Sequence, residues 1–384
     1  MKISCKTVGK ADITLYQSAS GLPDSWDLLL PDGHPMRKHS LMLYENMGLA
    51  DISFFYALSG DPARPKALAY FQLLSIKPYH LNANLLSGWQ ARTIPPLIRL
   101  FHPTLLVAGH LFRHDIPTFY SVPECTDFES YRYYQEMIDA VAAQSCAKAS
   151  LVKDVPRGLV HYFQNFSGKF AQLRNDISME MCLPDEWKDF TDYEKSLKHK
   201  YAQKLRKVRA SVKHLQIEEL DESAVYAQSS DLFALYSQVC RNQTFSMGMV
   251  NEQFLPDLKR AYKDRLKIWG LYEQGKMVAF ASAWVHDAVF DMFYIGFDYG
   301  RNAELNLYFN ILYLSIEKAI AFRKAHVVLG RTALEAKARL GCKPRYLHTF
   351  LSVRSKVLRD LVFAKINTQH IQEGAWEERH PFKA

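Results

Sequence analysis

A run of three strands followed by one long helix, in the second half of the chain, most restricts the folds open to this sequence. Apolar and aromatic residues between turn signals predict strands over Leu266–Glu273, Lys276–His286 and Val289–Asp298. Apolar residues recur with a period of 3.6 over Leu307–Arg323, which predicts a helix. Antiparallel strands that continue into a helix indicate an α+β fold, in which a central mixed or antiparallel sheet is flanked by helices.

The first half of the chain repeats this succession in a fainter form. Lys66–Ile76 and Thr104–Phe112 match the second and third strands, and Tyr133–Gln144 matches the long helix. Ala149–Val155 matches a short buried strand that we expect at Ala325–Gly330. Two copies of one α+β unit in tandem are the simplest explanation of this order.

The length of the chain agrees with two units. A chain of 384 residues fits two domains of about 150 to 200 residues each. The composition changes around Trp187–Tyr193, ahead of a basic run, and we therefore expect domains over residues 1–186 and 187–384. The last strand of the second domain is expected at Arg345–Ser352.

Composition and missing motifs exclude several classes of protein. No apolar run reaches the 18 or more residues of a membrane span, and the N-terminus lacks the apolar segment of a secretory signal, so we expect a cytoplasmic protein. The six cysteines lie far apart and predict reduced thiols. His110, His114 and Asp115 have the spacing of a strand end and turn, and we expect no metal site. The signatures of Rossmann redox enzymes, phosphate-loop hydrolases, serine hydrolases and zinc proteases are all missing.

Positive charge is concentrated in two short segments. The chain carries a net charge of +8, whereas residues 194–214 and residues 331–359 carry +7 each. Charge segregated in this way indicates either an anionic partner or two solvated faces. In the first segment an apolar stripe from Leu197 to Val212 predicts an amphipathic helix with a basic face. Lys200, Lys204 and Arg206 are its candidate anion-binding residues.

Four stretches of the second half resemble the GNAT-type acyltransferases, and more closely the tandem Fem/BioF-like branch, in which two GNAT-like units share one chain. They are Trp269–Phe280, Phe293–Tyr299, Leu307–Asn310 and Leu329–Pro344. The resemblance extends over residues 187–354 and continues more weakly over residues 26–155. It implies an N-acyltransferase that moves an acyl group from a thioester or ester donor to a small-molecule amine by direct attack.

The resemblance also implies where the reaction takes place. The arm of the donor is expected between two splayed central strands, where Phe293, Ile295 and Phe297 offer backbone groups that pair with it and polarise its carbonyl. The attacking amine must lose a proton and the leaving group must gain one. The candidate catalytic residues near the strand end are Asp298, Tyr299, Tyr308 and Glu335. Each also has a structural interpretation, as a turn cap, as a packed ring or as the partner of a nearby arginine.

The loop after the third strand does not determine which carrier the acyl donor has. In ordinary GNAT enzymes glycines in this loop let backbone N–H groups hold a pyrophosphate, whereas Gly300–Asn306 keeps an arginine and lacks the later glycines. The candidate donor-binding residues are Arg301, Asn302, Arg331, Thr332 and Lys337. Thr332 and Glu335 also have the spacing of a helix capping box.

Three functions are compatible with this sequence. Acyl-CoA is the favoured co-substrate of the implied transferase, which needs no tightly bound cofactor. Aminoacyl-tRNA or an acyl carrier protein is the alternative donor, because the two basic segments suit a polyanion. A non-catalytic binding protein on the same fold is the third interpretation, supported by the degenerate loop. The acceptor and the oligomeric state do not follow from the sequence.

Overall fold

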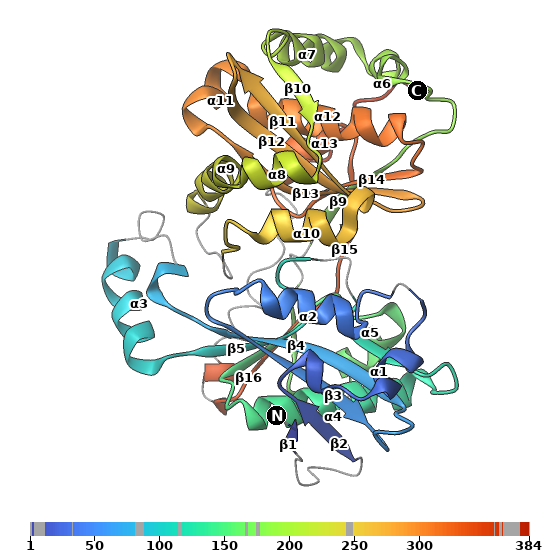
Figure 1. Cartoon of the computed structure of the whole chain (residues 1–384), viewed down its shortest axis with the longest axis vertical. Coiled ribbons are helices and arrows are strands. Elements are labelled where there is room, and N and C mark those ends of the chain that lie inside the picture. The colour runs from blue at the N-terminus through green and yellow to red at the C-terminus, as the bar shows by residue number, and fades with distance from the viewer. Residues whose placement is uncertain are drawn as a thin grey trace. The chain divides into compact units, whose positions relative to one another are not determined.

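The chain forms two compact units, each built on its own sheet (Figure 1). The computed structural model describes residues 2–3, 12–32, 34–80, 88–113, 117–165, 168–173, 177–242, 249–356, 358–360, 363 and 377–383. Unit 1 holds Met1–Asp176, Thr244–Val250 and Leu347–His370, and unit 2 holds Ile177–Gln243, Asn251–Tyr346 and Ile371–Ala384. Within the described part of the chain, no helix is both long and apolar enough to cross a membrane.

Unit 1 is a mixed sheet with helices packed against it. Its described strands are β1 (Lys2–Ile3), β2 (Ile13–Tyr16), β3 (Ile52–Ser59), β4 (Ala67–Ser75), β5 (Thr104–Ala108), β6 (Phe119–Ser121), β7 (Ala149–Val152), β8 (Ala171–Leu173) and β16 (Thr349–Val353). They run in the order β1-β2-β3-β4-β5-β7-β16-β8, with β6 beside β4. Only β5 and β7 pair in parallel among these described strands.

The helices of unit 1 are fixed by caps and by one apolar face. They are α1 (Asp24–Leu29), α2 (Lys38–Asn46), α3 (Gly88–Phe101), α4 (Asp127–Gln144) and α5 (Arg157–Asn165). Thr126 and Glu129 form a reciprocal capping box at the start of α4, which satisfies backbone N–H groups that a helix otherwise leaves unpaired. Tyr134, Met137 and Val141 lie on the buried face of α4 and pack in the core of the unit.

Unit 2 repeats this architecture around a sheet in the order β10-β11-β12-β13-β14-β9-β15. Its strands are β9 (Ile177–Cys182), β10 (Gln216–Glu219), β11 (Leu266–Glu273), β12 (Lys276–Val285), β13 (Val289–Phe297), β14 (His326–Gly330) and β15 (Lys343–Tyr346). Its helices are α6 (Phe190–Ser196), α7 (His199–Ala210), α8 (Glu222–Ala227), α9 (Ser229–Arg241), α10 (Phe254–Tyr262), α11 (Tyr299–Leu305), α12 (Leu307–Ala321) and α13 (Leu334–Ala338).

The expected fold class is confirmed, because the same succession of elements occurs in both units. The strands β4 and β5, the helix α4 and the strand β7 correspond to β12, β13, α12 and β14. In both units the last of these strands pairs in parallel with the second strand of the set. Two tandem α+β units of this kind are what the repeat in the sequence predicts.

The expected last strand, Arg345–Ser352, is wrong in one respect, since the structure has two strands there. β15 pairs with β9 in unit 2, whereas β16 pairs with β7 and β8 in unit 1. Thr349 and Phe350 are buried in the sheet of unit 1, and this burial fixes β16 in the first sheet. Conversely, β9 precedes residue 187 and belongs to the sheet of unit 2. The compact units therefore differ from a single cut between residues 186 and 187.

A glycine allows helix α9 to lie directly on β13. A Cβ atom built on Gly296 would lie 2.6 Å from the backbone nitrogen of Tyr236 and 2.7 Å from the carbonyl carbon of Leu235. Both atoms belong to the backbone of α9, which cannot move aside as a flexible side chain can. The absence of a side chain at Gly296 is therefore required for this helix to cover the middle of the sheet.

We expect Gly296→Ala to lower the free energy of unfolding by about 1 to 3 kcal/mol, because the added methyl group pushes α9 off the sheet. Gly21→Ala is the matched control, since a Cβ atom at Gly21 meets nothing within 4 Å. Urea denaturation of both variants measures the difference. Equal stability of the two variants would contradict this close approach of α9 to β13.

Candidate functional site

Strands β13 and β14 separate after a short stretch of parallel pairing. Val289–Asp291 pairs with His326–Val328, and beyond these residues β13 pairs with β12 alone while β14 pairs with β9. Among the described residues, no strand therefore pairs with the edge of Met292–Phe297 that faces β14. A free edge of this kind can pair with the extended arm of a ligand. Phe293, Ile295 and Phe297, the residues predicted to hold a donor, all lie on this part of β13.

Both predicted catalytic tyrosines, Tyr299 and Tyr308, lie near the end of β13. The ring of Phe297 stacks on the ring of Tyr299 with centroids 4.7 Å apart, and its centroid lies 6.0 Å from that of Tyr308. Burial raises the pKa of both tyrosines above the usual value, and the effect is larger for Tyr308. Both phenols are therefore protonated at neutral pH and can donate a hydrogen bond.

A buried lysine lies beside the end of β14. Lys337, on the short helix α13, is only 1% exposed, and its Nζ lies 3.8 Å from the position that a Cβ atom of Gly330 would occupy. Burial lowers the pKa of Lys337 to about 8, and the neighbouring thiol of Cys342 opposes this shift. From the sequence, Lys337 is a candidate for binding the anionic part of the donor. A buried amine with this pKa is instead suited to proton transfer near neutral pH.

Sequence reasoning did not single out Cys342, which connects these groups. Its thiol is 3% exposed, and burial raises its pKa to about 12. Cys342 lies close enough to Lys337 and to Tyr308 to influence the pKa of each. The structure therefore places Tyr299 and Tyr308 near the end of β13 and Lys337 beside the end of β14. Cys342 is close to Lys337 in the sequence, whereas nothing in the local sequence indicates its proximity to Tyr308.

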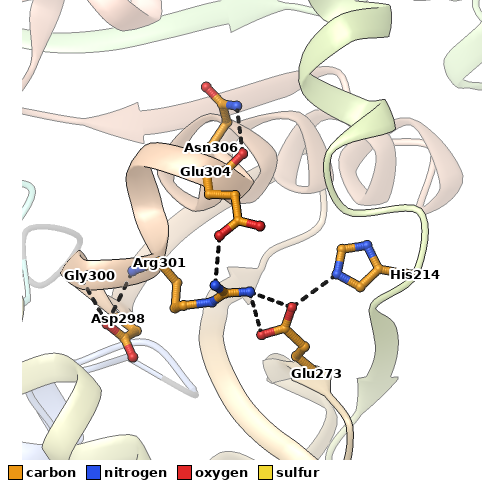
Figure 2. Close-up of polar contacts among 7 residues, drawn as sticks. All are labelled: His214, Glu273, Asp298, Gly300, Arg301, Glu304 and Asn306. Atoms are coloured by element: carbon orange, nitrogen blue, oxygen red, sulfur yellow. Dashed lines mark hydrogen bonds and ion pairs between the residues drawn. The ribbon is translucent and has the colours of Figure 1, made fainter.

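The start of helix α11 has no backbone group left for a phosphate. The carboxylate of Asp298 accepts hydrogen bonds from the N–H groups of Gly300 and Arg301, at 2.8 and 3.3 Å (Figure 2). The backbone carbonyl of Asp298 accepts the N–H of Asn302 at 3.0 Å. The N–H of Tyr299 donates to Oε1 of Gln238 at 3.1 Å. Asp298, predicted as a catalytic residue, is thus the cap of α11. Its negative charge lies at the N-terminus of a helix, the position that otherwise favours an external anion.

The arginine predicted to bind donor phosphates is held by two carboxylates. Nη2 of Arg301 donates to both carboxylate oxygens of Glu273, at 2.7 and 2.9 Å, and Nη1 donates to Glu304 at 2.6 Å (Figure 2). Nε2 of His214 lies 3.1 Å from Glu273 on its other side. The hydrogen bond from Arg301, followed by that from His214, lowers the pKa of Glu273. Arg301 therefore closes the hairpin between β11 and β12 onto α11.

Asn302 and Glu335, two further predicted site residues, form hydrogen bonds within the protein. The side chain of Asn302 accepts the backbone N–H of Tyr308 at 3.0 Å. Glu335 accepts hydrogen bonds from Arg339 at 2.5 Å and from Arg379 at 3.1 Å. The capping box predicted for Thr332 and Glu335 is wrong, because α13 begins after Ala333, which has a left-handed backbone and makes no side-chain cap. Thr332 is exposed and Arg331 is half-buried.

The basic helix α7 forms part of a cavity of about 590 Å³ in unit 2. The cavity is lined by residues of two segments far apart in the sequence, Lys198, His199, Lys200, Tyr201, Glu378, Arg379 and His380. The chain end is held there by backbone hydrogen bonds of 2.8 Å, from Lys198 to Pro381 and from Lys383 to Ser196. Sequence reasoning found Lys200 and missed the three residues near the chain end, since only this pairing brings them to α7.

The three predicted anion-binding residues of α7 differ in the contacts that their side chains make with described residues. Nζ of Lys204 lies 5.2 Å from the centroid of the Phe309 ring, and burial followed by the nearby charge of Arg339 lowers its pKa. Arg206 donates to Glu194 at 2.6 Å. Lys200 lies over the ring of Tyr201 and makes no ion pair with a described residue. Of these three residues, Lys200 and Lys204 are the two that make no ion pair with a described residue and are open to an anion.

The described residues include no group of three or more His, Cys, Asp and Glu side chains that could hold a metal ion. Nδ1 of His110 is close to two backbone N–H groups, those of Phe112 at 3.1 Å and Arg113 at 3.2 Å, and His110 is buried. His114 and Asp115, the other members of the group considered in the sequence, lie outside the described residues.

Comparison with known proteins agrees with this architecture. The model of the FemAB-like family, described as peptidoglycan biosynthesis or recognition, matches residues 163–384. A crystal structure of FemX superimposes with a TM-score of 0.50 and 9% identity over 84% of this chain and 94% of that chain. A tandem GNAT protein from the clavulanic acid biosynthesis pathway gives a TM-score of 0.50 and 9% identity, over 90% and 99%. No curated protein sequence matches significantly.

The lowered pKa of Lys337 predicts a pH-dependent effect on stability. Its pKa is about 8 in the folded protein and close to 10.5 in the unfolded chain. Between these values the unfolded chain binds a proton that the folded protein does not, so stability from this group rises with pH. Below pH 8 the buried ammonium lowers the free energy of unfolding by an amount that no longer changes with pH.

We therefore expect Lys337→Met to stabilise the protein at about pH 7, by up to about 3 kcal/mol, and this gain to shrink between pH 8 and about pH 10. Urea denaturation at several pH values measures it. Lys343→Met, at an exposed residue of β15, is the control and should show no such trend. A gain that does not change with pH would contradict a buried, weakly basic Lys337.

Proposed function

The chain belongs to the FemAB-like family, and on this basis we propose that it is a transferase that moves an activated acyl group onto an amine. The family description concerns peptidoglycan, so the acceptor we propose is the free amine of a peptidoglycan peptide. The observation that carries the proposal is the separation of β13 from β14, with Lys337 beside the end of β14. In the proposed reaction Lys337 serves as the proton acceptor, and Tyr299 and Tyr308, near the end of β13, supply two phenols.

The proposed reaction forms one amide bond and breaks one ester bond. The amine nitrogen of the acceptor attacks the carbonyl carbon of the donor, and the donor arm is held along the free edge of Met292–Phe297. Neutral Lys337 takes the proton that the amine loses, which its pKa of about 8 allows near neutral pH. The resulting ammonium returns this proton to the leaving oxygen. Tyr299 or Tyr308 donates a hydrogen bond to the carbonyl oxygen as negative charge develops on it.

Aminoacyl-tRNA is the donor that we propose. The start of α11 supports this choice, because Asp298 accepts the N–H groups on which a pyrophosphate would depend. In addition, Glu273 and Glu304 neutralise Arg301. The cavity between α7 and the chain end offers cations instead, among them Lys198 and Lys200. Such a surface suits the phosphates of a nucleic acid.

Acyl-CoA, which the sequence favoured, is the second candidate. Its support is the free edge of β13, which suits an extended pantetheine arm and does not depend on the N–H groups of α11. An acyl-CoA would then have to hold its phosphates elsewhere, because the loop at Asp298 is closed by its own carboxylate.

A donor assay distinguishes these proposals. The purified protein is incubated with a soluble muramyl pentapeptide that has a free side-chain amine, and with either bulk tRNA charged with labelled amino acids or labelled acyl-CoA. We expect label to move from tRNA to the peptide, with kcat/KM rising to a plateau above about pH 8. Lys337→Met should lower kcat by about 100-fold or more, and Lys343→Met should leave it unchanged. Transfer from acyl-CoA alone would favour the second candidate, and transfer from neither donor would overturn the proposed activity.

Charge reversal at the cavity and at Lys204, further along α7, tests the site of the carrier. Lys198→Glu, Lys200→Glu and Lys204→Glu together should raise the KM for charged tRNA by about 100-fold and leave kcat nearly unchanged, because these residues bind phosphates away from the reacting atoms. The salt dependence of KM should become shallower, by about two to three units of the logarithmic slope. Lys276→Glu, at the exposed start of β12, is the control. Equal KM values for the triple variant and the control would contradict tRNA binding at this cavity.

A further inference from the structure

Helix α3 of unit 1 exposes large apolar side chains along one face. Trp89 is 68% exposed, Leu97 50%, Leu100 70% and Phe101 65%. At 100° per residue these four side chains fall within one arc of the helix, which also holds the exposed Thr93, and the half-buried Ile94 and Ile98 follow beyond the Phe101 end of the arc. The neighbouring Tyr79 is 69% exposed. Single exposed apolar residues are normal, whereas several large ones gathered on one face mark a site of interaction.

The chain segment that carries this face has charges of one sign only. From Lys77 to Arg113 the sequence contains no aspartate and no glutamate. Arg92 and Arg99 are exposed, and neither makes an ion pair with a described residue. Both fall on the same border of the apolar arc, as the helical period requires. The helix lies at the periphery of unit 1, on the side away from α1 and α5 (Figure 1).

We propose that α3 binds the surface of an anionic lipid membrane. A helix that lies in a membrane interface buries aromatic and aliphatic side chains among the acyl chains, while arginines at its border contact the lipid phosphates. Trp89, Leu97, Leu100 and Phe101 supply the first group, and Arg92 and Arg99 supply the second. The absence of acidic residues from Lys77 to Arg113 is what favours an anionic surface over a neutral one. The binding is peripheral and reversible, and it is independent of the proposed transfer reaction.

Vesicle flotation of the full-length protein tests this inference. Vesicles of phosphatidylcholine with phosphatidylglycerol are compared with vesicles of phosphatidylcholine alone. We expect binding to the anionic vesicles, and we expect Leu100→Glu to weaken it by about tenfold or more. Leu28→Glu is the matched control, because Leu28 is 85% exposed on α1 and should tolerate the same change without effect on binding. The double variant Arg92→Gln/Arg99→Gln should lose the preference for anionic lipid.

The depth of Trp89 gives a second measurement. Brominated lipids should quench part of the tryptophan fluorescence of the bound protein, and Trp89→Phe should remove that quenching. Absence of flotation with either kind of vesicle would overturn the proposal. So would equal weakening by Leu100→Glu and Leu28→Glu. A change in self-association without a change in vesicle binding would identify the face as a contact between copies of the chain, and would also overturn it.

Discussion

The separation of β13 from β14 is the constraint on which the candidate site depends. Parallel strands normally form hydrogen bonds with each other along their whole length, but here the pairing of β13 with β14 stops at Asp291 and Val328. β12 continues to support β13 on one side, and β9 supports β14 on the other. Helix α9 covers β13 because Gly296 has no side chain. The sheet can therefore leave backbone groups of β13 unpaired by any strand of the described residues without losing its core.

Negative charge at the start of α11 makes this end of the separated strands a poor binding site for an anionic ligand group. A helix N-terminus attracts anions, and Asp298 supplies one from the chain itself. Arg301 is divided between Glu273 and Glu304. An arginine held by one carboxylate of the β11–β12 hairpin and by another of its own helix links the hairpin to the helix, and it offers little to a third anion. The cations that are open to a ligand lie instead on α7, in residues such as Lys200 and Lys204.

The sequence predicted local elements well, because they depend on patterns within one segment. The strands up to Asp298 and the helix after Leu307 follow from turn residues and apolar period alone. The placement of Tyr299 and Tyr308 near the end of β13 follows equally from the local order. Pairing between distant segments could not be predicted. β16 in the sheet of unit 1 and Arg379 at the cavity of α7 each depend on contacts between segments far apart in the sequence, which leave no local pattern. The burial of Lys337 belongs to the same class, since its neighbours in sequence are those of a basic surface segment.

Hydrogen–deuterium exchange with and without a donor tests the account most directly. The probe is an aminoacyl-tRNA analogue in which an amide replaces the reactive ester, so that the complex persists. The account predicts slower exchange of backbone N–H groups in Met292–Phe297, because the donor arm pairs with this edge of β13. It also predicts slower exchange at the start of α7. Protection confined to other parts of unit 2, with unchanged exchange along β13, would contradict the claim that the separated strands receive the donor.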